Sequence, residues 1–218
     1  MLERISRRER FDLVISWLAI SIAFSLAFSG GIGVWMGSPL KEISLGEYLL
    51  YFILSMVTVG VGFVLHELAH KFTAMHYGYW AEFRKDNLML LVAVVLAALV
   101  GVVFAAPGAT LIYGAGVTRE QNGKISAAGP VTNLLLCIPF AFLLALVAWL
   151  GITTWWGQLL TLTGMVGLQV NAMIASFNML PVSVLDGRKV LAWNPAVFAV
   201  LIIASFGLLI ATLYPAIM

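Results

Sequence analysis

The sequence predicts an all-α polytopic membrane protein with about five to six transmembrane helices. The chain has 218 residues, of which 62% are hydrophobic and only 10% are charged. Because an average soluble domain is about a quarter charged, this chain has too few charges to cover a solvated surface. The charged residues are also grouped, and the runs that contain none are 13–40, 48–65, 88–118, 125–185 and 190–218. A helix needs about 20 predominantly apolar residues to cross a bilayer, and several of these runs are long enough.

We expect transmembrane helices at the longest apolar stretches, separated by helix-breaking residues. The expected helices, in chain order, are 13–35, 48–76, 127–150, 159–179 and 195–214. Pro181, Asn194 and Pro195 mark helix ends near the last two. The first apolar run is longer than the core of a cleavable signal peptide, and no clean cleavage signature follows it. We therefore expect this run to be a retained membrane helix.

A less regular segment is expected between the second and third helices. The polar stretch 77–87 leads into an apolar run at 88–106, which Pro107-Gly108 interrupts. Glycines and an Asn-Gly pair punctuate residues 109–125, which we expect to form strand and turn. No internal repeat and no low-complexity linker is recognisable, so residues 1–218 are expected to form a single integral-membrane domain.

Cysteine content and charge distribution exclude some classes of site. The single cysteine, Cys137, lies in an apolar segment, so neither a disulfide framework nor a thiolate metal site is expected. Nucleic-acid binding has no support, because no basic stripe exists outside the first ten residues. We interpret Arg4, Arg7, Arg8 and Arg10 as a cytoplasmic anchor for the N-terminus under the positive-inside rule.

The second expected helix contains the sequence His66-Glu67-Leu68-Ala69-His70. Two histidines at i and i+4 lie on one face of a helix, one turn apart, so both imidazoles can bind one zinc ion. The intervening Glu67 then lies near the water that this ion activates, and can deprotonate it. The alternative is a chance arrangement of hydrogen-bonded polar residues. Ionisable groups inside a membrane helix are costly unless they are paired or functional, and this cost favours the metal site.

A catalytic zinc ion usually has three protein ligands and a water molecule, so a third ligand is needed. Downstream of Glu120 the remaining 98 residues contain one acid, Asp186. In isolation, Asp186 would be interpreted as a turn residue of an Asp-Gly pair at a helix end. As the acid available to complete the site, it is predicted to be the third metal ligand.

These motifs, in this order, resemble the site-2 protease family of intramembrane zinc metalloproteases. The resemblance covers Val61 to Lys189 and rests on HExxH in a membrane helix, on N-x-x-P-x4-D-G from Asn178 to Gly187, and on Ala128-Gly129-Pro130-Val131-Thr132-Asn133 between them. It implies that His66, His70 and Asp186 bind one zinc ion. It also implies that Glu67 is the general base and that Asn178 hydrogen-bonds the oxyanion. The catalytic core is then about 48–189, with peripheral helices at 13–35 and 195–214.

The family also carries a membrane-associated β-hairpin after the HExxH helix, which aligns an extended substrate. Its candidate strands here are Tyr79–Arg84 and Ala109–Tyr113. Asn133 carries over from the resemblance only as a packing or substrate-gate residue. For Asn178, which lies beside the helix break at Pro181, the alternative role is to cap a broken helix.

The positions of the metal ligands also constrain the topology. His66, His70 and Asp186 must meet at one depth, which requires residues 88–125 to cross the membrane an even number of times, most economically zero. The run 88–106 is then a re-entrant or cavity-buried element, although it is long enough to span. With no net crossing, every positive charge except Lys41 lies on the cytoplasmic side, eleven against one. A single crossing gives seven against five, so the charges favour the first arrangement.

The sequence therefore predicts an enzyme that cleaves transmembrane segments of other proteins, with the lipid bilayer and a transmembrane protein substrate as its partners. It is expected in the cell membrane, with the N-terminus and the active-site opening on the cytoplasmic side. The main alternative is a metal or ion transporter, which would need neither Glu67 nor Asn178. An inactive relative is disfavoured by the intact ligands and base. A prenyl-protein type of zinc protease would need a later helical glutamate as its third ligand, and the last 98 residues contain no acid other than Asp186.

Overall fold

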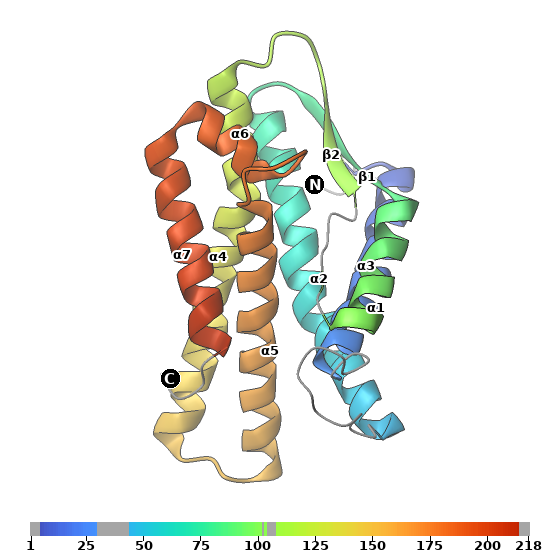
Figure 1. The fold of residues 1–218 in the computed structure, drawn as a ribbon, viewed down its shortest axis with the longest axis vertical. Helices are drawn as coiled ribbons and strands as arrows, with labels where there is room; N and C mark the ends of the chain where they lie inside the picture. The colour runs from blue at the N-terminus through green and yellow to red at the C-terminus, as the bar shows by residue number, and fades with distance from the viewer. Residues whose placement is uncertain (1–4, 30–43, 102, 104–107, 214–218) are drawn as a thin grey trace.

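The computed structural model describes residues 5–29, 44–101, 103 and 108–213, which form an elongated helical bundle with a small two-stranded sheet (Figure 1). The elements in chain order are α1 (Arg7–Phe28), α2 (Leu45–His76), β1 (Trp80–Lys85), α3 (Asn87–Val100), β2 (Gly108–Tyr113), α4 (Arg119–Leu150), α5 (Trp155–Asn178), α6 (Asp186–Trp193) and α7 (Pro195–Leu213).

Five of the described helices, namely α1, α2, α4, α5 and α7, are long and apolar enough to cross a membrane. Their outer faces carry exposed apolar side chains such as Ile53 and Val57 of α2 and Ile203 of α7. Such side chains are stable against lipid, where helices associate through close packing and hydrogen bonds rather than by escaping water. The prediction of a mainly helical, polytopic membrane protein with a small sheet is confirmed.

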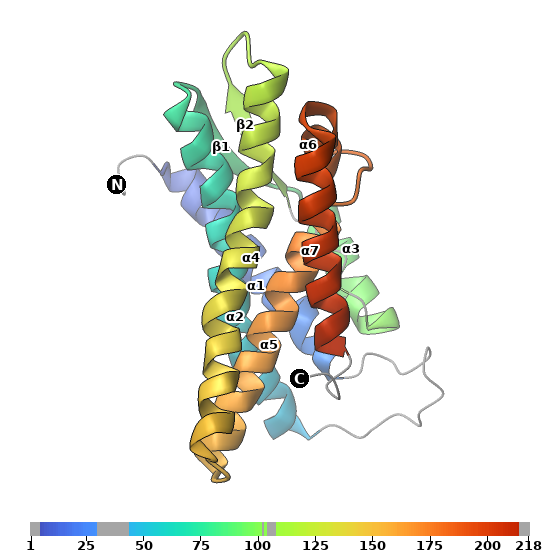
Figure 2. The same cartoon turned by 90° about the vertical axis from the view of Figure 1, so that its left-hand side faces the viewer.

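Helix α2 lies between two groups of elements, as the views in Figures 1 and 2 show. On one side α1 packs against α2, and α3 and β1 pack against α1. On the other side α4 and α5 pack against α2 and run beside each other, α6 packs against α4 at one end of the bundle, and α7 runs from α6 along α5. Helix α2 therefore contacts both groups, which also meet each other in the main core.

Helix α1 begins six residues before the predicted start at residue 13, because Ser6 accepts a hydrogen bond from the Glu9 backbone N–H at 3.2 Å and caps the helix. The helix ends at Phe28, and residues 30–35 of the prediction lie outside the described residues. The earlier start places the charged residues Glu9 and Asp12 inside the helix, where both are buried.

Helix α4 starts at Arg119, so the prediction of a turn up to Ile125 was wrong. Thr118 and Gln121 form a capping box, in which each side chain accepts the backbone N–H of the other at 3.0–3.1 Å. Gly123 lies within the first turns of this helix, where a Cβ would overlap Trp193 of α6. The glycine permits close packing of α4 against α6. From the sequence alone, a glycine that permits such packing cannot be told apart from a glycine that forms a turn.

The two predicted strands are present with slightly shifted ends, and they pair antiparallel from Trp80↔Tyr113 to Lys85↔Gly108. Because Lys85 and Gly108 are partners, the chain that connects them leaves and returns at the same place. The predicted even number of membrane crossings needs both ends of this connection on one side of the membrane, and the pairing is compatible with that prediction. Within that connection α3 has 14 residues, fewer than the roughly 20 that a span needs.

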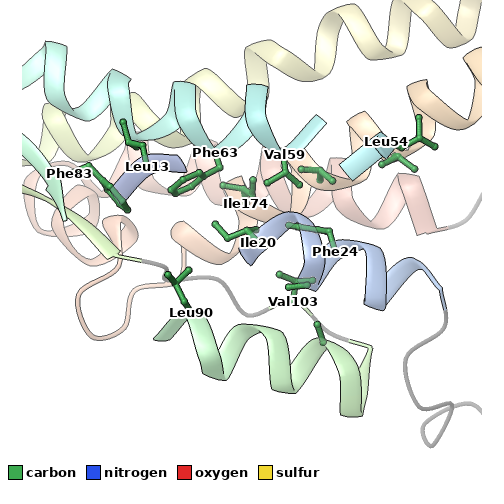
Figure 3. Close-up of a cluster of buried hydrophobic side chains, with 14 residues drawn as sticks. Leu13, Ile20, Phe24, Leu54, Val59, Phe63, Phe83, Leu90, Val103 and Ile174 are labelled. Carbon is green, nitrogen blue, oxygen red and sulfur yellow. The ribbon is translucent and has the colours of Figure 1, made fainter. Parts of the chain in front are cut away.

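The main apolar core lies where α1, α2, α3 and α5 meet (Figure 3). Ile20 and Phe24 of α1, Val59 and Phe63 of α2, and Ile174 of α5 are among its buried members. Figure 3 also shows Leu90 of α3 and Phe83 of β1 pointing into this cluster. The Phe63 and Phe83 rings meet edge to face, with centroids 5.5 Å apart, and this contact ties the sheet to α2.

Candidate metal centre

The HExxH sequence lies in the last third of α2. This helix starts with a capping box between Ser44 and Glu47 and continues without a proline to His76. His66 and His70 are one turn apart on the face toward α4, with only 2% and 6% of their surfaces exposed. Their Nε2 atoms lie 3.0 Å apart, so both imidazoles point at one place.

Asp186 is the first residue of α6, after a loop that follows the end of α5. Gly187 permits the close return of this loop, because a Cβ there would overlap the Met179 backbone carbonyl. The Asp186 Oδ2 atom lies 3.0 Å from His70 Nε2 and 3.4 Å from His66 Nε2. The structure thus brings the three predicted ligands together, although Asp186 is more than a hundred residues away in the chain.

The three side chains suit a metal ion in both chemistry and space. One ligand atom from each lies within 4.8 Å of the others, and all three residues are buried. Two imidazoles and one carboxylate are a donor set found in catalytic zinc sites, which leave a further coordination position open. Gly129 of α4 faces the group: a Cβ there would lie 2.6 Å from His66 Nε2 and closer still to His70 Nε2. Glycine at 129 therefore leaves the space that an ion needs.

Both imidazoles are oriented by an oxygen acceptor on the side away from the metal position. His66 Nδ1 lies 2.6 Å from Asn133 Oδ1, and His70 Nδ1 lies 2.7 Å from the Ile125 backbone carbonyl. A carbonyl oxygen only accepts, so the Ile125 contact places the His70 proton on Nδ1 and leaves Nε2 with its lone pair. The Asn133 amide has its oxygen toward His66, which fixes that ring in the same way. Such outer partners orient metal-binding histidines.

Asn133 belongs to a buried hydrogen-bond network that crosses the bundle. Its Nδ2 donates to the Gly62 carbonyl at 3.0 Å and to Asn171 Oδ1 at 2.9 Å. Asn171 Nδ2 in turn donates to the Gly167 carbonyl of its own helix at 2.9 Å. The resemblance suggested a packing or substrate-gate residue at position 133, whereas the structure places it against the His66 imidazole. The sequence interpretation missed Asn171, although an asparagine in the apolar α5 helix was an available signal.

The three predicted ligands line a cavity, and the two other predicted site residues, Glu67 and Asn178, line it as well. Glu67 is 8% exposed, and its Oε2 accepts a hydrogen bond from Thr110 Oγ1 of β2 at 2.8 Å. Asn178 at the end of α5 is half-buried, and its Nδ2 donates to the Ile174 backbone carbonyl at 3.0 Å. The residues that line the cavity come from α1, α2, β2, α4, α5 and α6. Thr110 was not singled out in the sequence, because nothing local indicates that β2 reaches Glu67.

One cation lies beside the metal-ligand group. Lys189 Nζ is 3.8 Å from Asp186 Oδ1, the carboxylate oxygen that faces away from the histidines, and its side chain is 40% exposed. A partly exposed pair at this distance contributes little to stability. Its position leaves Oδ2 directed at His66 and His70.

Two known proteins are similar in sequence to this chain. A protein of Methanocaldococcus jannaschii named "Putative zinc metalloprotease MJ0611" is 40% identical over 198 residues, which cover 90% of each chain. A Bacillus subtilis protein named "Putative zinc metalloprotease YwhC" is 28% identical over 163 residues, 66% of this chain and 73% of its own. No family model and no solved structure matches. At 40% identity over nearly the whole length, the chain belongs to the same family as the M. jannaschii protein, a family whose members are named as zinc metalloproteases.

Proposed function

We propose that this protein is an intramembrane zinc metalloendopeptidase of the site-2 protease type, which acts in regulated proteolysis by cleaving peptide bonds within transmembrane segments of substrate proteins. The observation that carries the proposal is the buried group of His66, His70 and Asp186 among membrane-spanning helices. The two histidines lie ten and six residues before the end of α2 at His76, which corresponds to roughly 15 and 9 Å along the helix axis. We infer that this depth lies within the membrane, so that a peptide bond cleaved there belongs to a membrane-embedded segment.

Each side chain of the site has a role in this reaction. His66, His70 and Asp186 would hold the zinc ion, and a zinc ion bound there would supply Lewis-acid activation of the water and of the scissile carbonyl. Glu67 accepts the proton that the attacking water loses and returns it to the leaving amine as the carbon–nitrogen bond breaks. Asn178 has a second amide hydrogen beyond the one given to Ile174, and it donates this hydrogen to the oxyanion.

The test of this function separates metal binding from chemistry. We expect Glu67→Gln to retain zinc, because the ligands remain, while cleavage of a reconstituted transmembrane substrate falls by about 10²- to 10⁴-fold. Asp186→Ala should lose zinc as well as activity, whereas Asn178→Ala should lose activity and keep zinc. Metal analysis of the purified variants and an electrophoretic cleavage assay in liposomes measure both quantities.

Three results would contradict the proposal or one of its residue roles. Cleavage by Glu67→Gln at the wild-type rate would remove Glu67 from the chemistry. Zinc passage through the liposome membrane, with no cleavage of any transmembrane substrate, would favour the transporter alternative. Retention of full zinc by Asp186→Ala would show that Asp186 is not a metal ligand and only forms the start of α6.

We further propose that the chain lies in the cell membrane with its N-terminus and the site's opening toward the cytoplasm, so that cleavage releases a cytoplasmic fragment. The excess of positive charges at the end of the bundle that carries α6 and the start of α4 supports this orientation. The paired ends of Lys85 and Gly108 support it as well, because they leave residues 86–107 without a net crossing.

Cysteine labelling tests the orientation. In a Cys137→Ser background, Arg119→Cys at the start of α4 should resist an impermeant thiol reagent that is applied to intact cells. Thr153→Cys, in the exposed loop after the 32-residue α4, lies across the membrane and should react rapidly. Permeabilised cells should label both positions. Labelling of residue 119 but not of residue 153 in intact cells would show that the orientation is opposite to the one proposed.

A further inference from the structure

Helix α2 has a second functional face, formed by the two residues that directly follow His66 and His70 in the sequence. Glu67 and Lys71 are one turn apart, as His66 and His70 are, and they point toward the two-stranded sheet rather than toward α4. Lys71 Nζ donates to the Ala81 carbonyl of β1 at 2.7 Å, and Glu67 accepts from Thr110 of β2. Each strand of the sheet is thus attached to the HExxH segment by one of these side chains.

The attachment of β1 is fully buried and charged. Lys71 Nζ also lies 2.7 Å from Glu9 Oε2, and neither side chain is more than 1% exposed. The other oxygen of Glu9 accepts the Phe83 backbone N–H at 3.0 Å. The ammonium group and the carboxylate therefore bind a carbonyl and an N–H group two residues apart on β1. This ion pair fixes β1 in position relative to α1 and α2.

Because β1 and β2 are paired in a defined register, fixing β1 in position also fixes Thr110 of β2. Phe83, which Glu9 holds, is the direct partner of Thr110 across the sheet. The residues of β2 alternate between half-buried and exposed, and Thr110 is one of those that face inward. Its Oγ1 reaches Glu67 Oε2 at 2.8 Å. Among the residues that the structure describes, no other side chain donates a hydrogen bond to this carboxylate.

We propose that Thr110 is a positioning residue for the general base: its hydroxyl holds the Glu67 carboxylate in the orientation in which it receives the proton. This inference rests on the proposed function, since it assumes that Glu67 is the base. The physical reason is geometric. A glutamate has three side-chain torsions, and proton transfer requires the carboxylate within about 2.6–3.2 Å of its partner. A donor on a strand that is fixed by a buried ion pair removes much of this freedom.

The experiment compares two substitutions of the same residue in the full-length, zinc-loaded protein in liposomes. Thr110→Val keeps the shape and removes the hydroxyl, and Thr110→Ser keeps the hydroxyl. We expect Thr110→Val to lower kcat by about 10- to 100-fold, the range for a lost hydrogen bond to a charged group, with little change in KM. Thr110→Ser should retain most of the wild-type kcat. Zinc content and thermal stability should stay at the wild-type level in both.

A matched control is Thr161→Val in α5, whose hydroxyl donates to the Gly157 carbonyl of its own helix at 2.9 Å and should not affect turnover. Wild-type kcat in Thr110→Val, with Glu67→Gln inactive, would overturn the inference and leave the proposed function intact. An equal loss in the valine and serine variants, accompanied by lost zinc or stability, would also overturn it, because the role would then be structural. Cleavage by Glu67→Gln at the wild-type rate would overturn both proposals.

Discussion

The face of α2 that carries His66 and His70 meets α4 through neutral groups, whereas the face that carries Glu67 and Lys71 meets the sheet and α1 through charges. On the metal side, amide and carbonyl oxygens accept from the imidazoles, and a glycine gives the closest approach. On the sheet side, a buried ammonium–carboxylate pair binds the backbone of β1.

This difference separates two physical tasks. The metal side must leave space for an ion and keep two imidazoles neutral, so it is sensitive to added volume and to lost acceptors. The sheet side must fix a short strand between α1 and α2, and it is sensitive to the loss of one charge from a buried pair. A two-stranded sheet is marginally stable alone, and the ion pair attaches it to the helices in addition to the packing of Phe83 against Phe63.

The largest effect is expected from adding one methyl group on the metal side. Gly129→Ala would place a Cβ 2.6 Å from His66 Nε2 and closer to His70 Nε2, so the ligands must move apart. We expect zinc affinity to fall by more than the roughly 10- to 100-fold that loss of an outer hydrogen-bond partner causes. Chelator competition measures this. Gly207→Ala in α7, where no atom lies within 4 Å of the added methyl, is the control. Normal zinc in Gly129→Ala would show that the space at 129 is not required.

The next effect is expected from breaking the pair on the sheet side. Lys71→Met leaves the Glu9 carboxylate buried without its partner, which should destabilise the protein by about 3–5 kcal/mol. The double variant with Glu9→Gln removes both charges and keeps an acceptor for the Phe83 N–H, so it should recover part of the loss. Unfolding in detergent measures the stability, and metal analysis should find zinc retained. Loss of zinc without loss of stability would mean that the two faces are not separate in their tasks.

A smaller effect on zinc binding is expected from substitutions in the hydrogen-bond network of Asn133 and Asn171. Asn133→Ala removes the acceptor of His66 Nδ1 and should weaken zinc binding by about 10- to 100-fold. Asn171→Ala should have less effect, because Asn171 reaches His66 only through Asn133. The same chelator competition ranks the two variants. An Asn171→Ala effect equal to that of Asn133→Ala would indicate that the network acts as one unit rather than through one contact.

Sequence and structure differ most where charges are buried. Glu9 and Asp12 precede the first charge-free run, and the predicted helix therefore began after them. The structure includes both in α1 because Glu9 pairs with Lys71, 62 residues away, and Asp12 lies 3.5 Å from Arg84, 72 residues away. Local hydropathy cannot anticipate such partners. For the same reason the Asn122-Gly123 pair predicted a turn, whereas contact with Trp193 explains the glycine within a helix.

The sequence by itself determined the features that depend on near neighbours: the apolar spans, the two histidines one turn apart, and Asp186 as the acid available near the end of the chain. Composition and helical periodicity express these directly. Only the tertiary structure decided which groups orient the imidazoles, why position 129 is glycine, how β1 is attached, and that Thr110 reaches Glu67. Each of these is a contact between elements far apart in the chain, and it exists only after the helices have packed.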